Sequence, residues 1–185
     1  MSGVEWFEQS NVIAKWEAAA KKTSDDGKTE AATFGDAAIA LISVFDLING
    51  LGMAKKDMLG NANTVANFAK ENPGMQLQDL VEAEIAAELA APKAKSKGEV
   101  VKKLADNGKK CTCAMLWLCR ALTFNKEMLA ALCSDPNKKM SECVNAGYEL
   151  SLKPHHSFVV KGVFKAAVGS APSRATFLQS LLGDS

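Results

Sequence analysis

Three groups of polar residues lie in stretches of the sequence that are otherwise apolar or rich in helix-forming residues. They are Asp57 with Asn61, Trp117 with Arg120, and His156 in the only histidine pair. An unpaired polar group costs roughly 1–3 kcal/mol when it is buried, so residues of this kind need a partner or a function. Side chains three or four residues apart on a helix share one face. The spacing therefore predicts polar groups that converge on a ligand.

The residue types at these positions suit a sugar. Carboxylate and amide groups hydrogen-bond paired hydroxyls, and an indole stacks on the apolar face of a pyranose ring. Structural roles are alternatives at each position. Asp57 is a candidate helix N-cap, Trp117 suits a helical core, and a buried Arg120 needs a carboxylate partner, for which Asp57 is a candidate.

The sequence gives little support to catalysis or to nucleic-acid binding. It contains no nucleophile elbow, phosphate-binding loop, HExxH motif or paired-carboxylate motif. A Cys–His nucleophile pair stays open, because its members need only meet in space. The 22 basic and 21 acidic residues are nearly balanced, whereas nucleic-acid binders neutralise many phosphates. We expect a protein that is not an enzyme, uses no cofactor and binds no nucleic acid.

The five cysteines favour free thiols in a reducing compartment. Cys111 and Cys113 are separated by one residue rather than the two or more that are usual in zinc sites, so we expect no metal. The N-terminal residues lack the apolar segment of a signal peptide. The longest strongly apolar run, AAIALISVF, is less than half of the roughly 20 residues that span a bilayer. We expect a cytoplasmic location.

The elements that must position these residues are helices. No segment alternates with a period of two, and several helical stretches are apolar on most faces, which is typical of central helices in a layered packing. We predict one all-α domain over residues 1–185, with about eight helices in a two-layer sandwich. The expected helices are 4–22, 29–49 with Thr29 as its cap, one from Asp57 to 71, 76–90, 99–133 with a bend near 107–108, 138–152, 156–169 and 173–182.

The segment FDLINGLGMAKKDMLGNANTVANFAKENPGMQLQDLVEAE resembles the glycolipid transfer protein family. AMLWLCRALTFNKEML and NAGYELSLKPHHSFVVKGVFKAAVGSAPSRATFLQSLL resemble it as well. The family places an asparagine four residues after an aspartate, a tryptophan three residues before an arginine, and a histidine after a tyrosine-containing helix. The resemblance covers roughly residues 35–182 and implies a helical fold that encloses a single lipid.

The resemblance also implies a role for each matching residue. Asp57 would bind sugar hydroxyls and the ceramide amide N–H, and Asn61 would add hydrogen bonds to the sugar. Trp117 would stack beneath the sugar ring, Arg120 would hold the geometry of the site, and His156 would bond the amide carbonyl. Tyr148 and Phe158 fall at the positions of a tyrosine near the amide and of an aromatic residue that touches the membrane.

One position departs from the family pattern. Thr64 occupies the place of a lysine seven residues after the aspartate, so one charged donor to the headgroup is missing. The ceramide-1-phosphate branch of the family has basic residues where Asn61 and Trp117 stand, and a phosphate needs such cations. We therefore expect a glycosphingolipid ligand. Lys55 and Lys56 lie nearby and keep the ceramide-1-phosphate alternative open.

The resemblance implies a monomeric carrier that docks transiently on membranes. Phe158 with Lys153 and Lys161 forms a candidate membrane contact. The acyl chains would be shielded by apolar side chains, with candidates Val44, Phe45, Leu116, Phe124, Phe158 and Phe164, which are also candidates for an ordinary filled core. A lipid sensor or interaction module that uses the same pocket is the alternative to a carrier.

Overall fold

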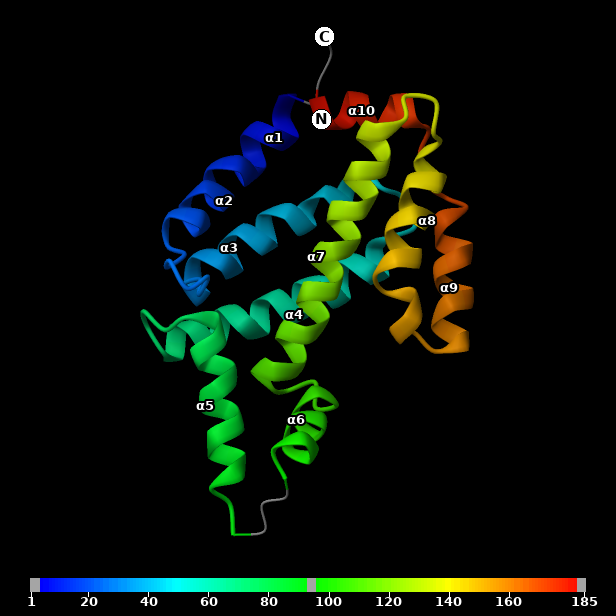
Figure 1. The fold of residues 1–185 in the computed structure, drawn as a ribbon. Helices are drawn as coiled ribbons and strands as arrows, with labels where there is room; N and C mark the ends of the chain where they lie inside the picture. The colour runs from blue at the N-terminus through cyan, green and yellow to red at the C-terminus, as the bar shows by residue number, and fades with distance from the viewer. Residues whose placement is uncertain (1–3, 93–95, 183–185) are drawn as a thin grey trace. The chain divides into compact units, whose positions relative to one another are not determined.

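The computed structural model describes residues 4–92 and 96–182, and within these ranges the chain is helical. Two isolated β-bridges join Thr23 to Thr29 and Glu30 to Gln76. The prediction of an all-α protein is thus confirmed. The helices in Figure 1 are α1 Val4–Ser10, α2 Val12–Lys21, α3 Ala31–Ile42, η1 Ser43–Leu47, α4 Gly52–Glu71, α5 Leu77–Leu89, α6 Lys97–Ala105, α7 Cys111–Ser134, α8 Met140–Leu150, η2 Lys153–His155, α9 Phe158–Val168 and α10 Arg174–Leu182.

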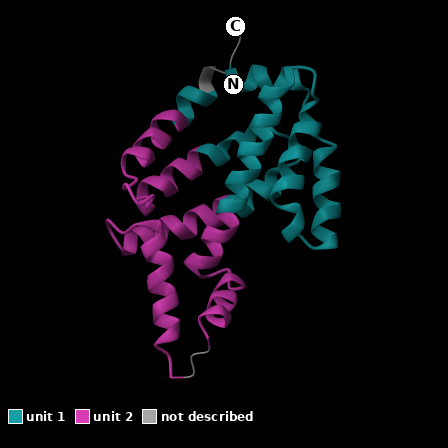
Figure 2. Cartoon of the chain, viewed as in Figure 1, with its two compact units in different colours: residues 1–11, 41–58, 119–185 teal, residues 12–40, 59–118 magenta. Residues whose placement is uncertain are grey.

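The chain divides into two compact units (Figure 2). Unit 1 comprises residues 1–11, 41–58 and 119–185, and unit 2 comprises residues 12–40 and 59–118. Helices α4 and α7 each contribute their residues to both units. A single domain over the whole chain stays a prediction, and each unit is described by itself.

Four predicted helix boundaries are wrong, each for a local reason. The segment 4–22 is two helices, because Asn11 adopts a φ of 50°, a left-handed conformation that asparagine tolerates. Thr29 pairs with Thr23 instead of capping α3, and the predicted helix 29–49 is shorter: α3 runs from Ala31 to Ile42 and the 3-10 segment η1 follows it. The stretch 99–133 is two separate helices, of which α6 starts with a capping box between Ser96 and Glu99.

The fourth error concerns the segment that contains the predicted headgroup residues. Asp57 does not start a helix, because α4 already begins at Gly52. The weak helix formers Asp57, Gly60 and Asn61 therefore lie inside a helix of 20 residues. An N-cap role for Asp57 is excluded.

Unit 1 is built around the second half of α7. The rings of Phe45 and Phe124 stack with centroids 5.6 Å apart, and Phe164 meets Phe124 edge-on at 6.0 Å. Helix α8 packs closely on α7 because Gly147 has no side chain: a Cβ there would lie 2.7 Å from the carbonyl oxygen of Phe124. Helices α8 and α9 lie side by side, joined through η2 (Figure 1). This packing positions α8, the helix that carries Tyr148.

Unit 2 is held together by a ring contact, a close helix approach and a helix cap. Trp16 on α2 meets Phe34 on α3 edge-on at 5.7 Å. Gly35 on α3 lies against Ala66 on α4, at 3.5 Å from the Ala66 Cβ to an ideal Cβ on Gly35. Glu84 on α5 caps the start of α7, because its carboxylate oxygens accept from two backbone N–H groups of α7. These contacts fix the helix that carries Trp117.

Candidate functional site

The first part of the candidate site is a stripe along α4. Asp57, Asn61 and Thr64 are at positions i, i+4 and i+7 of one helix, so they share one face. Asp57 is exposed, whereas Asn61 and Thr64 are half-buried. The Thr64 hydroxyl donates to the carbonyl oxygen of Gly60 at 2.9 Å. The stripe thus presents a carboxylate and a side-chain amide one turn apart, with a neutral residue in the next turn.

Lys55, a nearby candidate for the missing cationic donor, has another carboxylate partner. Its Nζ is 2.5 Å from the carboxylate of Asp46 in unit 1, and its side chain is only 24% exposed. Releasing Lys55 to bind a phosphate would break this partly shielded pair. Lys56 is exposed and remains a candidate.

The second part of the candidate site is carried by α7. Trp117 and Arg120 are both half-buried and three residues apart on this helix. Glu84 anchors the start of the helix with three hydrogen bonds, from Cys111 N–H at 3.1 Å, Thr112 N–H at 2.8 Å and the Thr112 hydroxyl at 2.7 Å. A carboxylate at a helix N-terminus also interacts favourably with the helix dipole. Glu84 is not among the site residues predicted from the sequence, because its partners are 27 and 28 residues away along the chain.

The third part is the contact between Tyr148 and His156. The Tyr148 hydroxyl is 3.1 Å from His156 Nδ1. Tyr148 is buried, and its ring stacks on Phe164 with centroids 3.7 Å apart. Burial raises the pKa of Tyr148, aided by Glu149, so the phenol keeps its proton and can donate it to Nδ1. In that arrangement the neutral imidazole carries its own proton on Nε2, which is then a donor.

Charges around His156 connect it with two other predicted residues. Burial lowers the pKa of His156 from its ordinary value of 6.5, and Asp57 opposes this shift. His155, Lys161 and Arg120 lower the pKa further. Desolvation favours the neutral ring, so His156 is uncharged at neutral pH.

Four of the predicted site residues therefore belong to one neighbourhood within unit 1. Asp57 and Arg120 both act on His156 electrostatically, and Tyr148 touches it. Asn61, Thr64 and Trp117 lie in unit 2, on the continuations of α4 and α7. Each of the following residues interacts with another group of the protein: Asp57, Asn61, Trp117 and Arg120.

The candidates for shielding acyl chains fall into two classes. Val44, Phe45, Phe124 and Phe164 are buried, and the three phenylalanines form one aromatic cluster in unit 1. Phe158 is 91% exposed and Leu116 is 36% exposed. Phe158 thus belongs to the surface, and its assignment to the interior was wrong.

The surface around Phe158 is strongly apolar for a protein exterior. Val159, Val160 and Val163 on the same helix are exposed by 72%, 42% and 49%, and Leu150 by 68%. Lys161 lies among these side chains on α9. Lys153, the other predicted basic contact, pairs with Glu149 one helical turn before it at 2.5 Å. Exposed large apolar side chains gathered on one helix in this way are typical of interaction sites.

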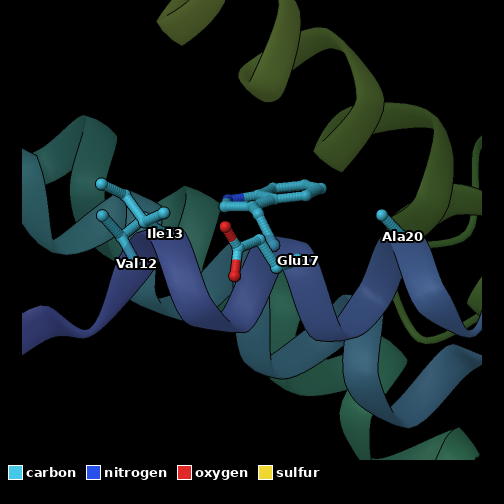
Figure 3. Close-up of a pocket in the computed structure, with 5 residues that line it drawn as sticks. Val12, Ile13, Glu17 and Ala20 are labelled. Atoms are coloured by element: carbon cyan, nitrogen blue, oxygen red, sulfur yellow. The ribbon is translucent and has the colours of Figure 1, made fainter.

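A shallow hollow lies along α2 in unit 2 (Figure 3). It is lined by Val12, Ile13, Trp16, Glu17 and Ala20, and the labelled side chains project from one helix (Figure 3). None of the predicted headgroup residues lines it. It is a surface depression lined mainly by apolar side chains of α2, which carries none of the residues predicted to bind the headgroup.

Three further observations concern a cysteine nucleophile, a metal site and a membrane-spanning helix. Burial, together with Glu84, raises the pKa of the Cys111 thiol to about 11, which disfavours the thiolate that a nucleophile or a metal ligand needs. Within 4–92 and 96–182, no group of three His, Cys, Asp or Glu side chains is arranged to hold a metal ion. In the same ranges no helix has both the length and the apolar character needed to cross a bilayer.

Comparison with known proteins gives consistent matches over most of the chain. The model of the family described as "Glycolipid transfer protein (GLTP)" matches residues 29–183. A glycolipid transfer protein from Aureobasidium melanogenum is 28% identical over 164 residues, which cover 86% of this chain and 72% of the relative.

Solved structures agree with these sequence matches. A structure described as showing how FAPP2 selects simple glycosphingolipids with the GLTP fold has a TM-score of 0.69 and 27% identity, covering 85% of this chain and 69% of the other. Human ceramide-1-phosphate transfer protein with bound 12:0 ceramide-1-phosphate has a TM-score of 0.72 at 18% identity, covering 93% and 79%, and at that identity it supports the fold alone. The family consists of lipid transfer proteins rather than enzymes. Because the family model covers most of the chain, this protein belongs to the glycolipid transfer protein family.

Proposed function

We propose that this protein binds a single sphingolipid, preferentially a glycosphingolipid, and transfers it between membranes as a monomer. The observation that carries the proposal is the neighbourhood of Tyr148, His156, Asp57 and Arg120 in unit 1 of a chain from this family. This neighbourhood offers a neutral donor beside a carboxylate. An amide presents one acceptor and one donor, which match these two groups.

The ceramide amide is bound through His156 and Asp57. Because Tyr148 occupies Nδ1 as a donor, the Nε2–H of His156 donates to the amide carbonyl. The Asp57 carboxylate accepts from the amide N–H and from a sugar hydroxyl, using its two oxygens. Desolvation of His156 supports this role, since a neutral ring costs less free energy to cover with a lipid than a charged ring does.

The sugar is bound by groups on α4 and α7. Asn61 adds amide hydrogen bonds to hydroxyls, and Trp117 stacks on the apolar face of the ring. Arg120 holds the geometry of the carboxylate site. Thr64 supplies no charge at the position of the family lysine, and its hydroxyl already donates to Gly60.

Ceramide-1-phosphate is the alternative ligand, and a structural neighbour that binds it shares the fold. A phosphate is recognised by several cationic donors. Asn61, Thr64 and Trp117 supply none, and Lys55 is already paired with Asp46, so Lys56 and Arg120 are the cations that are left for a phosphate. The donor set therefore favours a sugar headgroup.

Membrane contact is made by Phe158, flanked by Lys153 and Lys161. An exposed aromatic side chain with three exposed valines on the same helix gains free energy when it enters the apolar part of a bilayer. Lys161 is attracted to anionic headgroups by about 1 kcal/mol near such a surface, whereas the charge of Lys153 is offset by its pair with Glu149.

The test is transfer of fluorescent glucosylceramide between vesicles. We expect Asp57→Val to abolish transfer while the helical circular dichroism is unchanged. Asp36→Val is the matched control, because Asp36 is an exposed aspartate on α3. Unchanged transfer in Asp57→Val, or equal loss in the two variants, would contradict the assignment of Asp57.

Two further measurements distinguish a glycosphingolipid ligand from ceramide-1-phosphate, and a lipid carrier from a lipid sensor. Trp117→Ala should slow glucosylceramide transfer more than ceramide-1-phosphate transfer, and equal losses would assign Trp117 to the core. Tight binding of glucosylceramide with negligible transfer would favour a lipid sensor over a carrier.

A further inference from the structure

Met53 is an exposed apolar residue on the face of α4 that carries the candidate headgroup residues. Its side chain is 76% exposed, and Asp57 follows it after four residues, so the two share one face of the helix. Asn61 and Thr64 continue the same face in the next turns. The stripe of α4 that contains a carboxylate and an amide therefore begins with an exposed thioether.

The position of Met53 distinguishes it from other apolar residues on the surface. Single exposed apolar side chains are common on proteins, so exposure alone does not identify a contact. Asp57, one turn after Met53, is also exposed, so this end of the polar stripe opens to the exterior. A lipid headgroup that binds Asp57 therefore approaches the surface on which Met53 lies.

The first turn of α4 repeats an arrangement that the first turn of α9 also shows. Met53 is the second residue of α4, and Lys56, which is exposed as well, follows it after three residues. Phe158 is the first residue of α9, and Lys161 follows it after three residues. Residues at i and i+3 of a helix are neighbours. Each helix thus places a basic side chain beside an exposed apolar one, a combination that suits the boundary between the headgroups and the acyl chains of a bilayer.

The two pairs belong to the same unit and adjoin the same site. Residues 41–58 and 119–185 are both parts of unit 1 (Figure 2). Met53 lies one turn before Asp57, and Phe158 lies two residues after His156. Asp57 acts on His156 electrostatically, so these two residues are near each other. Met53 and the apolar surface of α9 are therefore connected through the candidate amide site.

We propose that Met53 is a second membrane contact, which enters the bilayer together with Phe158 and brings Asp57 and His156 to the membrane surface. The inference rests on the proposed function, since it takes the surface of α9 as the first contact. A bilayer is favoured over a protein partner, because the chain belongs to a family of lipid transfer proteins, whose ligand resides in membranes. The flexible side chain of methionine also adapts to a partner without fixed shape, such as lipid acyl chains.

The experiment measures sedimentation of the full chain with sucrose-loaded vesicles of phosphatidylcholine and phosphatidylglycerol that contain no glycolipid. Met53→Gln replaces the thioether by a polar side chain of similar length that also favours a helix. Full burial of a methionine side chain corresponds to about ten- to a hundredfold in affinity, so a side chain that enters only the boundary region should contribute about three- to tenfold. We expect Met53→Gln to weaken vesicle binding by this factor and Met53→Leu to retain it.

Two control variants separate membrane docking from other effects. Ile13→Gln is the matched control, because Ile13 is similarly exposed, at 62%, on α2 in unit 2. It should bind vesicles as wild type does. Asp57→Val should also bind them normally, since these vesicles contain no ligand for the headgroup site.

Vesicle binding by Met53→Gln equal to that of wild type, or equal losses in Met53→Gln and Ile13→Gln, would overturn the inference. Analytical ultracentrifugation tests the other occupant of this surface: a wild-type dimer that Met53→Gln converts to a monomer would assign Met53 to an interface between copies of the chain and would overturn it as well. Wild-type protein that binds the vesicles but transfers no glucosylceramide would instead refute the proposed function and leave the result for Met53 in place.

Discussion

Replacing Gly147 by alanine should destabilise the protein and disturb the candidate site. The Cβ of an alanine at this position would lie 2.7 Å from the carbonyl oxygen of Phe124 and 3.1 Å from both the backbone nitrogen and the Cβ of Met128. Two of these three atoms belong to the backbone of α7, so a rotamer change cannot relieve the contact. Helix α8 must move away from α7.

The cost follows from overpacking of a close helix contact. Inserting a methyl group into a packed core costs typically about 1–3 kcal/mol. For a protein of this size, each kcal/mol lowers the melting temperature by roughly 2–4 °C, so we expect a decrease of about 2–12 °C in a thermal melt followed by circular dichroism. Because Tyr148 is the next residue, the same movement draws its hydroxyl from His156 Nδ1, and glucosylceramide transfer should slow.

The matched control is the same substitution at Gly162. This glycine is exposed within α9, and an added Cβ would meet nothing within 4 Å. Alanine is the better helix former by up to about 1 kcal/mol, so Gly162→Ala should raise the melting temperature. A melting temperature for Gly147→Ala equal to or above that of wild type would refute the reasoning, because it would mean that α8 does not pack on α7 as described.

Four further predictions follow from the site. Glu84→Ala removes three hydrogen bonds at the start of α7 and should lower the free energy of unfolding by about 1–3 kcal/mol in urea, whereas Glu82→Ala at an exposed position should leave it nearly unchanged. Tyr148→Phe keeps the stacked ring but removes the hydroxyl, so ¹⁵N spectra should show both neutral tautomers of His156 and glucosylceramide binding should weaken by about two- to tenfold. Because the pKa of His156 is lower when folded than when unfolded, its contribution to stability is complete above about pH 6.5 and should be lost as the pH falls through the lowered value; a thermal melt that is flat across this window would contradict its burial. Thr64→Lys restores the cationic donor of the family and should tighten the binding of glucosylceramide; an unchanged affinity would show that this donor is dispensable here.

The helical character of the chain could be predicted from the sequence because helix signals are local. Apolar spacing, proline and glycine breaks and capping residues act within a few positions, and they located α5, α8, α9 and α10 to within a few residues. The errors occurred where backbone conformation decided the outcome. Asn11 splits the first helix through a positive φ, and α4 begins five residues before Asp57.

The candidate site could be predicted in part. Spacing placed Asp57, Asn61 and Thr64 on one face of a helix, because helical periodicity is a property of the local chain. The contact between Tyr148 and His156 spans only eight residues, yet no local rule gives it, since it depends on the turn through η2. Phe158 was placed on both the surface and the interior by sequence reasoning, and only its exposure of 91% settled the matter.

The helical class, the family and the identity of the polar residues could be inferred without the structure, because each is encoded in residue types and their spacing along the chain. The tertiary structure decided which of these residues share an environment. The low pKa of His156 arises mainly from desolvation, which is created by packing and has no signature in the sequence around it. Two other features also arise from packing: the buried Oδ1 of Asn125 accepts no hydrogen bond, and Glu84 caps the start of α7. Each depends on groups that folding brings together or keeps apart, and burial then makes the presence or absence of a partner energetically important.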